Sequence, residues 1–387
     1  MRRAAALLAA ALAATAPRLV AQARPAISPD TLRRLLRIIA DDSMGGRGTG
    51  SRGDFLAAAY VAATFERLGL EPAGEHGTYF QTVPPSAWEG GPVAYPARNV
   101  IAVLRGRDPR LNHTYVSITA HNDHLGIARV AVDHDSIRAY DRVVRPAGAD
   151  SPRRAPTAAE AARIRVILDS LRAIRPPRRD SIYNGADDDG SGTVGLLEIA
   201  RTLAAGPRPR RSIVFVSHAA EELGDVGSEW YTDHATLPID SFVGEIDIDM
   251  ISRGDAGDVQ GGGPRYIEIV GSKRLSTEFG TLLETVNASL PEPFAFNYQF
   301  DAPGDPNQYY CRADHYSYAR YGVPSVSIST GLHLDYHQVT DEPQYVDYGK
   351  LARVATLTRA MALAVADLDH RAVIDGRRTD PHAPCVQ

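Results

Sequence analysis

Tyr183-Asn-Gly-Ala-Asp-Asp-Asp-Gly-Ser-Gly192 is the stretch around which this chain can be understood. Three consecutive aspartates lie between glycines, directly before the helix-like run of residues 193–203. Crowded carboxylates repel one another and resist the loss of their water unless a cation neutralises them. The flanking glycines allow the tight turns that aim one carboxylate at a fixed point. The same pattern is also typical of a surface turn followed by a helix N-cap, so this stretch alone leaves both interpretations open.

The composition is ordinary for a folded soluble protein. The 387 residues are 44% hydrophobic and 23% charged, with a formal net charge of −5. No basic cluster is present, so no nucleic-acid partner is expected. The two cysteines, Cys311 and Cys385, are too few for a cysteine-rich zinc site. Whether they pair is left open, and any metal must be bound by His, Asp and Glu.

The N-terminus has the pattern of an export signal. Arg2 and Arg3 precede the apolar run of residues 4–14, and Ala21-Gln-Ala23 offers a cleavage site. The apolar run is too short to span a bilayer, and no other segment reaches that length. The sequence therefore predicts a signal peptide over residues 1–23, a secreted or periplasmic protein and no membrane span.

Apolar strands alternate with amphipathic helices along most of the remaining chain. We expect strands at 99–104, 115–120, 212–217, 242–250, 266–270 and 325–329. We expect helices at 29–40, 53–70, 193–203, 228–234, 277–290 and 314–321, and a long last helix over 351–368. This alternation favours an α/β fold: a single three-layer domain with a mostly parallel, mixed central sheet flanked by helices.

Residues 127–181 interrupt this pattern with an arginine-rich, irregular stretch. Apolar residues recur there at helical spacing only from Ala161 to Ile174, which predicts one surface helix on an insertion. The stretch is too small to be a separate enzyme domain but large enough to roof a cleft.

Acidic and histidine residues collect where the predicted strands end. Sheets of this kind place ligands at the carboxyl ends of their strands, so we expect these side chains to converge on one edge. They are His121 and Asp123 after one strand, Glu221 and Glu222 after another, Asp249 at the end of a third, His337 after a fourth, and Asp188 just before a helix.

Histidine and carboxylate are the ligands expected for zinc where thiols are absent. One zinc ion takes about four ligands, and this set offers more. Two metals ~3.5–4 Å apart that share one carboxylate would use the whole set. Calcium is disfavoured, because imidazole is a poor ligand for it. Residue types alone do not separate zinc from cobalt or manganese.

Several motifs occur together and in a fixed order. They are Ala120-His-Asn-Asp-His-Leu-Gly126, the aspartate stretch, Glu221-Glu-Leu-Gly224, Asp247-Ile-Asp-Met250, Arg312-Ala-Asp-His315, and Asp335-Tyr-His337 with Asp341. In these motifs the chain resembles the co-catalytic dizinc aminopeptidase family (peptidase family M, number twenty-eight), especially its secreted bacterial members. The resemblance runs from about Gly46 to the last helix.

The resemblance implies two Zn²⁺ per chain. It makes His121 and Asp249 ligands of one ion, Glu222 and His337 ligands of the other, and Asp188 the bridge. The family pattern aligns with the middle residue of the aspartate triplet, and Asp187 is the alternative bridge.

The resemblance also implies roles for residues that are not ligands. Glu221 resembles the general base, and we expect its side chain to diverge from that of Glu222 because successive strand residues face opposite ways. Asp123 resembles the partner that fixes the tautomer of the first ligand histidine. Tyr336 corresponds to a tyrosine that donates to the oxyanion, with a buried structural tyrosine as the alternative. His124 matches a position that is not a ligand and is expected to form a structural hydrogen bond, whereas His218 and His333 could line the cleft.

The function that follows from the resemblance is that of a secreted zinc aminopeptidase. It would hydrolyse N-terminal residues from peptides with a free N-terminus, through a metal-activated bridging water. Residues 24–375 would form the peptidase domain, and residues 376–387 a C-terminal tail. The alternatives are a glutaminyl-cyclase-like or dipeptidase/carboxypeptidase-like member of the same fold, or a non-enzymatic binding module. The oligomeric state and the preferred N-terminal residue are not predicted.

Overall fold

The computed structural model describes residues 24–88, 93–259, 261–378 and 380–387, so the predicted signal peptide lies outside the described residues. The described residues form a nine-stranded central sheet in the order β1-β3-β7-β4-β8-β11-β9-β10, with β2 also paired to β3. The strands are β1 (Glu71–Pro72), β2 (Phe80–Val83), β3 (Ala97–Leu104), β4 (Tyr115–His121), β7 (Ser212–His218), β8 (Phe242–Ile248), β9 (Tyr266–Val270), β10 (Ala295–Asn297) and β11 (Ser325–Ser329).

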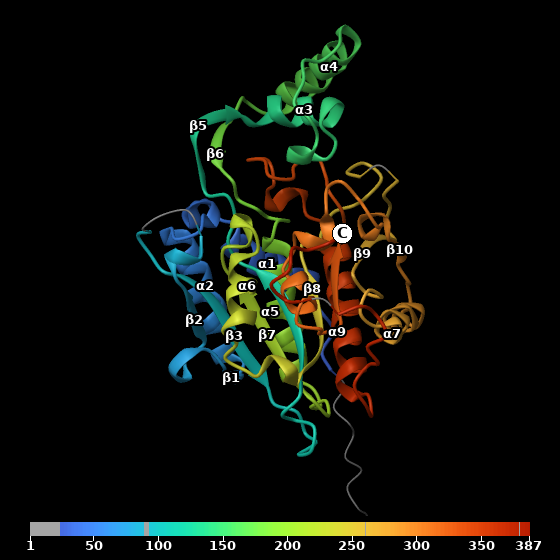
Figure 1. The fold of residues 1–387 in the computed structure, drawn as a ribbon. Helices are drawn as coiled ribbons and strands as arrows, with labels where there is room; N and C mark the ends of the chain where they lie inside the picture. The colour runs from blue at the N-terminus through green and yellow to red at the C-terminus, as the bar shows by residue number, and fades with distance from the viewer. Residues whose placement is uncertain (1–23, 89–92, 260, 379) are drawn as a thin grey trace, which may run out of the picture.

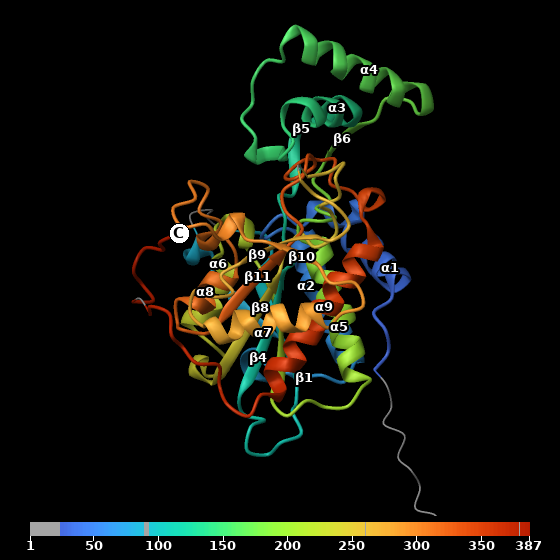
Figure 2. The same ribbon diagram turned by 90° about the vertical axis from the view of Figure 1, so that its right-hand side faces the viewer.

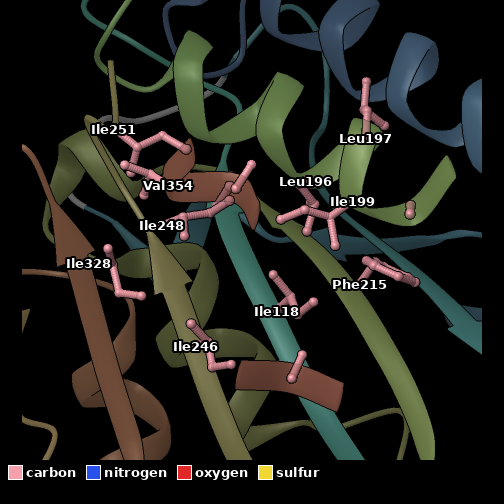
Figure 3. Close-up of a cluster of buried hydrophobic side chains, with 14 of the residues drawn as sticks. Ile118, Leu196, Leu197, Ile199, Phe215, Ile246, Ile248, Ile251, Ile328 and Val354 are labelled. Atoms are coloured by element: carbon pink, nitrogen blue, oxygen red, sulfur yellow. The ribbon is translucent and has the colours of Figure 1, made fainter. Parts of the chain in front are cut away.

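Helices cover both faces of this sheet, which confirms the predicted three-layer α/β fold (Figures 1 and 2). One face carries α1 (Pro29–Ile39), α2 (Arg52–Arg67), α5 (Gly190–Ala204), α7 (Thr277–Ala288) and α9 (Tyr348–Asp367). The other face carries α6 (Val226–Asp233) and α8 (His315–Ala319). In the larger core, strand residues such as Ile118 and Ile246 meet Leu196 of α5 and Val354 of α9 (Figure 3).

The four central strands run in the same direction. β4 pairs in parallel with β7 and β8, and β8 pairs in parallel with β11. The register places His121 beside His218 and Thr119 beside Asp247, so the carboxyl ends of these strands lie level. The outer strands β3 and β9 run antiparallel to their inner neighbours, which makes the sheet mixed.

The third predicted strand ends earlier than expected. It was predicted to continue to Met250, but β8 ends at Ile248. Met250 has a φ of +54°, in the left-handed region that a strand cannot use. Asp249 therefore lies in the loop just beyond the strand.

Helix α5 packs unusually close to the sheet. A Cβ atom added to Gly192 would lie 2.1 Å from the carbonyl oxygen of Ile248, so only glycine allows this approach. Nearly every residue of α5 is buried, in agreement with its many small and apolar residues.

The insertion contains more structure than was predicted. It consists of β5 (Ile127–Asp133), α3 (His134–Val144), α4 (Ala158–Ile174) and β6 (Arg179–Ile182), rather than one surface helix. β5 and β6 form an antiparallel ribbon that carries the two helices away from the body of the molecule (Figures 1 and 2). Helix α3 was missed because its buried positions include Asp135 and Asp141, which weaken the apolar periodicity.

A disulfide joins Cys311 to Cys385, with the two Cα atoms 5.7 Å apart. It ties the C-terminal segment to the residues just before α8. Among the described residues, no helix combines the length and the apolar character needed to cross a membrane.

Candidate metal centre

The five predicted ligands meet at the carboxyl edge of the parallel strands. His121 ends β4, Asp188 lies in the loop before α5, and Asp249 follows β8. Glu222 lies in the turn after β7, and His337 lies in the loop after β11. All of these except His121 line a pocket of about 220 Å³. Residues far apart in sequence therefore share one site.

Asp188 lies between the two histidines. Its Oδ1 atom is 3.3 Å from His121 Nε2, and its Oδ2 atom is 3.0 Å from His337 Nε2. On one side, His121 Nε2 is 3.6 Å from Asp249 Oδ1. On the other side, His337 Nε2 is 3.0 Å from Glu222 Oε2. Each side thus offers one imidazole and one carboxylate, with Asp188 common to both.

Several of these ligand atoms have no hydrogen-bond partner among the described residues. They are His121 Nε2, Asp188 Oδ2 and Asp249 Oδ1, all of them buried. Buried polar atoms are normally hydrogen-bonded, and unpartnered ones call for an explanation such as a bound ion. Imidazole nitrogens and carboxylate oxygens aimed at a common point are the donor set that zinc takes. The residues present therefore fit a zinc site.

The side chain of Asp187 is used to hold the surrounding loops. Its Oδ1 atom accepts hydrogen bonds from the Ser252 amide at 2.8 Å and the Ser252 hydroxyl at 2.5 Å. Its Oδ2 atom lies 3.1 Å from His333 Nε2. With both oxygens engaged, Asp187 is a poor candidate for a bridging ligand.

Asp189 is likewise occupied by the protein itself. Its carboxylate caps α5 by accepting from the Gly192 amide at 2.8 Å, and it also accepts from the amides of His121 at 3.1 Å and Met250 at 3.2 Å. The nearest oxygen and nitrogen atoms of His121, Asp189 and Asp249 lie within 4.8 Å of one another. We nevertheless favour Asp188 over Asp189 as the ligand, because its side chain lacks these backbone partners.

Asp123 connects His121 to Glu221. Its Oδ1 atom lies 3.6 Å from His121 Nδ1 and accepts a hydrogen bond from the Glu221 amide at 3.1 Å. Its Oδ2 atom accepts from the hydroxyl of Thr49 at 2.8 Å. Asp123 is fully buried, so it can hold both neighbours in place.

Glu221 lies beside the cluster and lines the pocket. Its Oε2 atom is 3.8 Å from His121 Nε2. Burial raises the pKa of Glu221 well above its usual range, which makes its carboxylate a stronger base. The expected reason for its divergence from Glu222 was wrong. The two residues lie in a single 3₁₀ turn that follows the left-handed Ala220 (φ +58°), not at the end of a strand.

His124 forms a hydrogen bond, as expected, and its partner is the predicted ligand Glu222. Its Nδ1 atom is 2.5 Å from Glu222 Oε1. The donor atoms of His124, Asp188, Glu222 and His337 lie within 4.8 Å of one another. His124 therefore either orients Glu222 or joins it as a ligand. Its position three residues after His121 was the available signal in the sequence.

The other two histidines do not line the pocket. His218 is fully buried, with Nε2 3.2 Å from the hydroxyl of Tyr318, and burial lowers its pKa to about 3. His333 is fully buried against Asp187. Both belong to the supporting structure.

The cluster is strongly acidic, and this shifts the pKa values of its histidines. Burial alone would lower the pKa of His337, but the carboxylates of Asp188 and Glu222 raise it to about 10. Burial opposes a charge on His121 too, but the carboxylates around it, led by Glu221, raise its pKa well above the usual value. This concentration of negative charge favours a cation.

Tyr336 forms part of the pocket wall next to His337. The two rings stack with their centroids 4.0 Å apart. The Tyr336 hydroxyl accepts a hydrogen bond from Arg312 Nη2 at 3.0 Å. Left-handed φ values at His337 (+54°) and Met250 (+54°) place two strained residues in this wall.

Arg47 was not recognised from the sequence, although it organises the base of the site. Its fully buried guanidinium donates to the carbonyls of Asn122 at 2.9 Å, Asn184 at 2.6 Å and Gly185 at 2.9 Å. It thereby links the segment after β4 to the aspartate stretch. A single arginine in a glycine-rich loop carries no sequence signal for such a role.

Comparisons with known proteins support the fold and identify a family. The model of Peptidase family M28 matches residues 156–362, which is more than half of the chain. Aminopeptidase NAALADL1 of Rattus norvegicus is 52% identical over 60 residues. That segment is 14% of this chain and 8% of the relative, so the match spans less than a tenth of the relative's length.

Solved structures with the same fold include two proteins that are named for different activities. BSAP, a zinc aminopeptidase from Bacillus subtilis, is 13% identical with a TM-score of 0.56, covering 88% of this chain and 95% of its own. Glutaminyl cyclase from Porphyromonas gingivalis is 18% identical with a TM-score of 0.58, covering 87% and 97%. At these identities the likeness supports the fold alone. The match of the family model over more than half of the sequence, on a chain with this fold and this cluster, shows that the chain belongs to peptidase family M28.

Proposed function

We propose that the chain is an exported, zinc-dependent aminopeptidase that removes N-terminal residues from peptides. The observation that carries this proposal is the position of Asp188 between His121 and His337, where His121 Nε2 and Asp249 Oδ1 have no hydrogen-bond partner among the described residues. Residues 24–375 would form the peptidase domain, with residues 1–23 as a cleaved signal peptide.

Two zinc ions, held by His121 and Asp249, by Glu222 and His337, and jointly by Asp188, would acidify a water molecule and polarise the scissile carbonyl. Glu221 lies beside these residues and has a raised pKa, as a proton acceptor requires. Its carboxylate would take the proton from the attacking water and deliver it to the leaving amine. The hydrogen bond from its amide to Asp123 fixes the turn that carries it.

Tyr336 is suited to stabilise the oxyanion. Because its oxygen accepts a hydrogen bond from Arg312, its own hydroxyl proton is free to point into the pocket. A donor aimed at the oxygen that becomes negative lowers the barrier, since it is already in place when the charge forms.

The lining of the pocket supports a free, protonated N-terminus on the substrate. The lining contains the carboxyl groups of Glu221, Asp225 and Asp249, whose oxygens can accept hydrogen bonds from an ammonium group. The lining also contains the apolar side chains of Met250, Val270, Phe300 and Leu332. The pocket therefore favours peptides that begin with an apolar residue.

The disulfide supports export. Cys311 and Cys385 are bonded, and such bonds persist in oxidising compartments. This agrees with the signal pattern in residues 1–23.

A substrate panel tests the proposal. The mature protein is assayed on leucine anilide, N-acetyl-leucine anilide, a peptide with N-terminal glutamine and a peptide with a blocked N-terminus and a free C-terminus. Of the two anilides, we expect hydrolysis of leucine anilide only. This activity should be lost when the metal is chelated and should return when zinc is added. Cyclisation of the glutaminyl peptide or cleavage of the blocked peptide would favour the alternatives of the same fold. No turnover and no zinc binding would indicate a binding module.

A further inference from the structure

The insertion reaches the wall of the pocket at residues 148–150. The amide of Ala149 donates to the carbonyl oxygen of Tyr336 at 3.0 Å. Gly148 has a φ of +51°, and a Cβ atom added there would lie 2.3 Å from the same carbonyl oxygen. A side chain at residue 148 would therefore push the insertion away from Tyr336. The contact is close enough to fix the backbone of the tyrosine.

The same turn is also connected, through Arg312, to the hydroxyl group of Tyr336. Asp150 Oδ2 accepts a hydrogen bond from Arg312 Nη1 at 3.2 Å and one from the hydroxyl of Tyr309 at 3.3 Å. Arg312 Nη2 in turn donates to the Tyr336 hydroxyl at 3.0 Å. Asp150, Arg312 and Tyr336 thus form a continuous line from the insertion to the pocket.

A second contact holds the insertion against the loop that carries Tyr336. Two nitrogens of Arg138, in α3, donate to the two carboxylate oxygens of Asp335, each at 3.0 Å. Asp335 is fully buried and also accepts from Arg253 Nη2 at 2.9 Å. The α3 and α4 region stands away from the body in Figures 1 and 2, yet it is anchored beside the residue that precedes Tyr336.

We propose that Asp150 is a positioning residue for the reaction, which acts through Arg312 on the hydroxyl of Tyr336. The inference rests on the proposed aminopeptidase function. An arginine is always charged and donates in a fixed plane, so it determines which side of the tyrosine oxygen accepts. Asp150 fixes the orientation of the Arg312 guanidinium. The hydroxyl proton of Tyr336 can then be donated to an acceptor in the pocket. The insertion is therefore part of the catalytic site.

The arginine needs such a partner because the pocket is acidic. Arg312 lines the same pocket as Asp188, Glu221, Glu222 and Asp249. Without Asp150, the guanidinium would be drawn toward these carboxylates and away from the tyrosine. The expected effect is on the transition state, because Tyr336 would donate to an oxygen that becomes negative only there.

The test compares Asp150→Asn with Asp169→Asn, in the metal-loaded protein and with leucine anilide as substrate. Asp169 lies exposed on α4, so the control makes the same chemical change in the same insertion. We expect Asp150→Asn to lower kcat about tenfold with KM within twofold and with unchanged metal content, the loss of one modest transition-state interaction. Asp169→Asn should match the wild type. Asp150→Glu, which keeps the ion pair, should recover part of kcat.

The double variant with Tyr336→Phe shows whether Asp150 acts through the tyrosine. In the Tyr336→Phe background, we expect Asp150→Asn to have no further effect on kcat. The proposal is overturned if Asp150→Asn behaves like Asp169→Asn in an active wild type. It is also overturned if the tenfold loss persists without the tyrosine hydroxyl, or if the loss comes from a lower melting temperature that Asp150→Glu does not restore. A wild type without aminopeptidase activity contradicts the proposed function itself, and the inference fails with it.

Discussion

The three consecutive aspartates, Asp187 to Asp189, have three different environments. Asp187 accepts hydrogen bonds from Ser252, and Asp189 accepts hydrogen bonds from three backbone amides. Asp188 alone directs its carboxylate at the two histidines. Like charges can be packed this closely because the two outer aspartates are stabilised by donors and the middle one faces a site suited to a cation.

This division predicts opposite effects for substitutions at neighbouring positions. Asp188→Ala should remove metal binding and activity, and the metal-free protein should lose less stability than Asp189→Ala does, since the imidazole of His337 loses a partner but no backbone amide does. Asp189→Ala should lower the free energy of unfolding by about 2–4 kcal/mol, because it removes a helix cap and leaves buried amides unpaired. Urea unfolding of the metal-free variants and elemental analysis of the loaded ones measure both effects. If Asp188→Ala kept its metal and lost as much stability as Asp189→Ala, the two aspartates would not have these separate roles.

Glu221 offers a separate test of the proton transfer. Glu221→Gln keeps the size of the side chain but cannot accept a proton, so kcat should fall by roughly 10²–10⁴-fold while metal content stays at the wild-type level. Steady-state kinetics with elemental analysis on the same sample provide the measurement. Near-normal turnover in Glu221→Gln would exclude it as the base.

The sequence was sufficient to predict the position of a side chain where its residue type has few other roles in a protein. Histidines and carboxylates after apolar strands were predicted to converge, and they do. His124 and Arg47 were not predicted to matter at the site. Their importance depends on neighbours that are distant in sequence, Glu222 for His124 and Asn184 for Arg47. Local patterns cannot contain that information.

The elements around the site depend on a few tight turns. The sequence predicted the central strands because continuous apolar runs mark buried strands. The edge strands β1, β2 and β10 have two to four residues, too few to show a period. The turn at Ala220 was also missed, because alanine is not a residue that normally signals a left-handed φ.

The start of α2 gives a test based on pH. Burial raises the pKa of Asp54, in the first turn of α2, from its ordinary value of 3.8 to about 8. The folded state therefore keeps this group protonated, whereas the unfolded chain ionises it near its ordinary pKa. The stabilisation is fully present below pH 3.8 and is lost as the pH rises toward 8.

The substitution Asp54→Asn isolates this effect, because asparagine cannot ionise and still offers an oxygen to the Gly50 amide. Between pH 4 and 8, the stability of Asp54→Asn relative to the wild type should increase by on the order of 1.4 kcal/mol per pH unit. Urea unfolding across this range is the measurement. A difference in free energy that does not change with pH would show that Asp54 is ionised in the folded state.

Considered as a whole, the molecule has an α/β fold with a mixed central sheet. The site lies at the carboxyl ends of the parallel strands, and the insertion is anchored beside it. The fold class followed from the alternation of strands and helices. The strand order could not be predicted, because the pairing of β4 with both β7 and β8 joins segments about a hundred residues apart and leaves no local pattern. The structure of the insertion was underestimated for a related reason, since its polar helix α3 is held by an ion pair to Asp335 in a distant loop and by another to Arg175 at the end of α4. The signal peptide and the domain boundaries stay predictions.

The ratio of zinc to protein in the mature chain tests the central claim most directly. That claim is that five side chains, from His121 to His337, bind two cations that share Asp188. Elemental analysis after equilibration with zinc and removal of the free metal should give two zinc ions per chain. A ratio of one, or of none, would contradict the shared role of Asp188 and the account built on it.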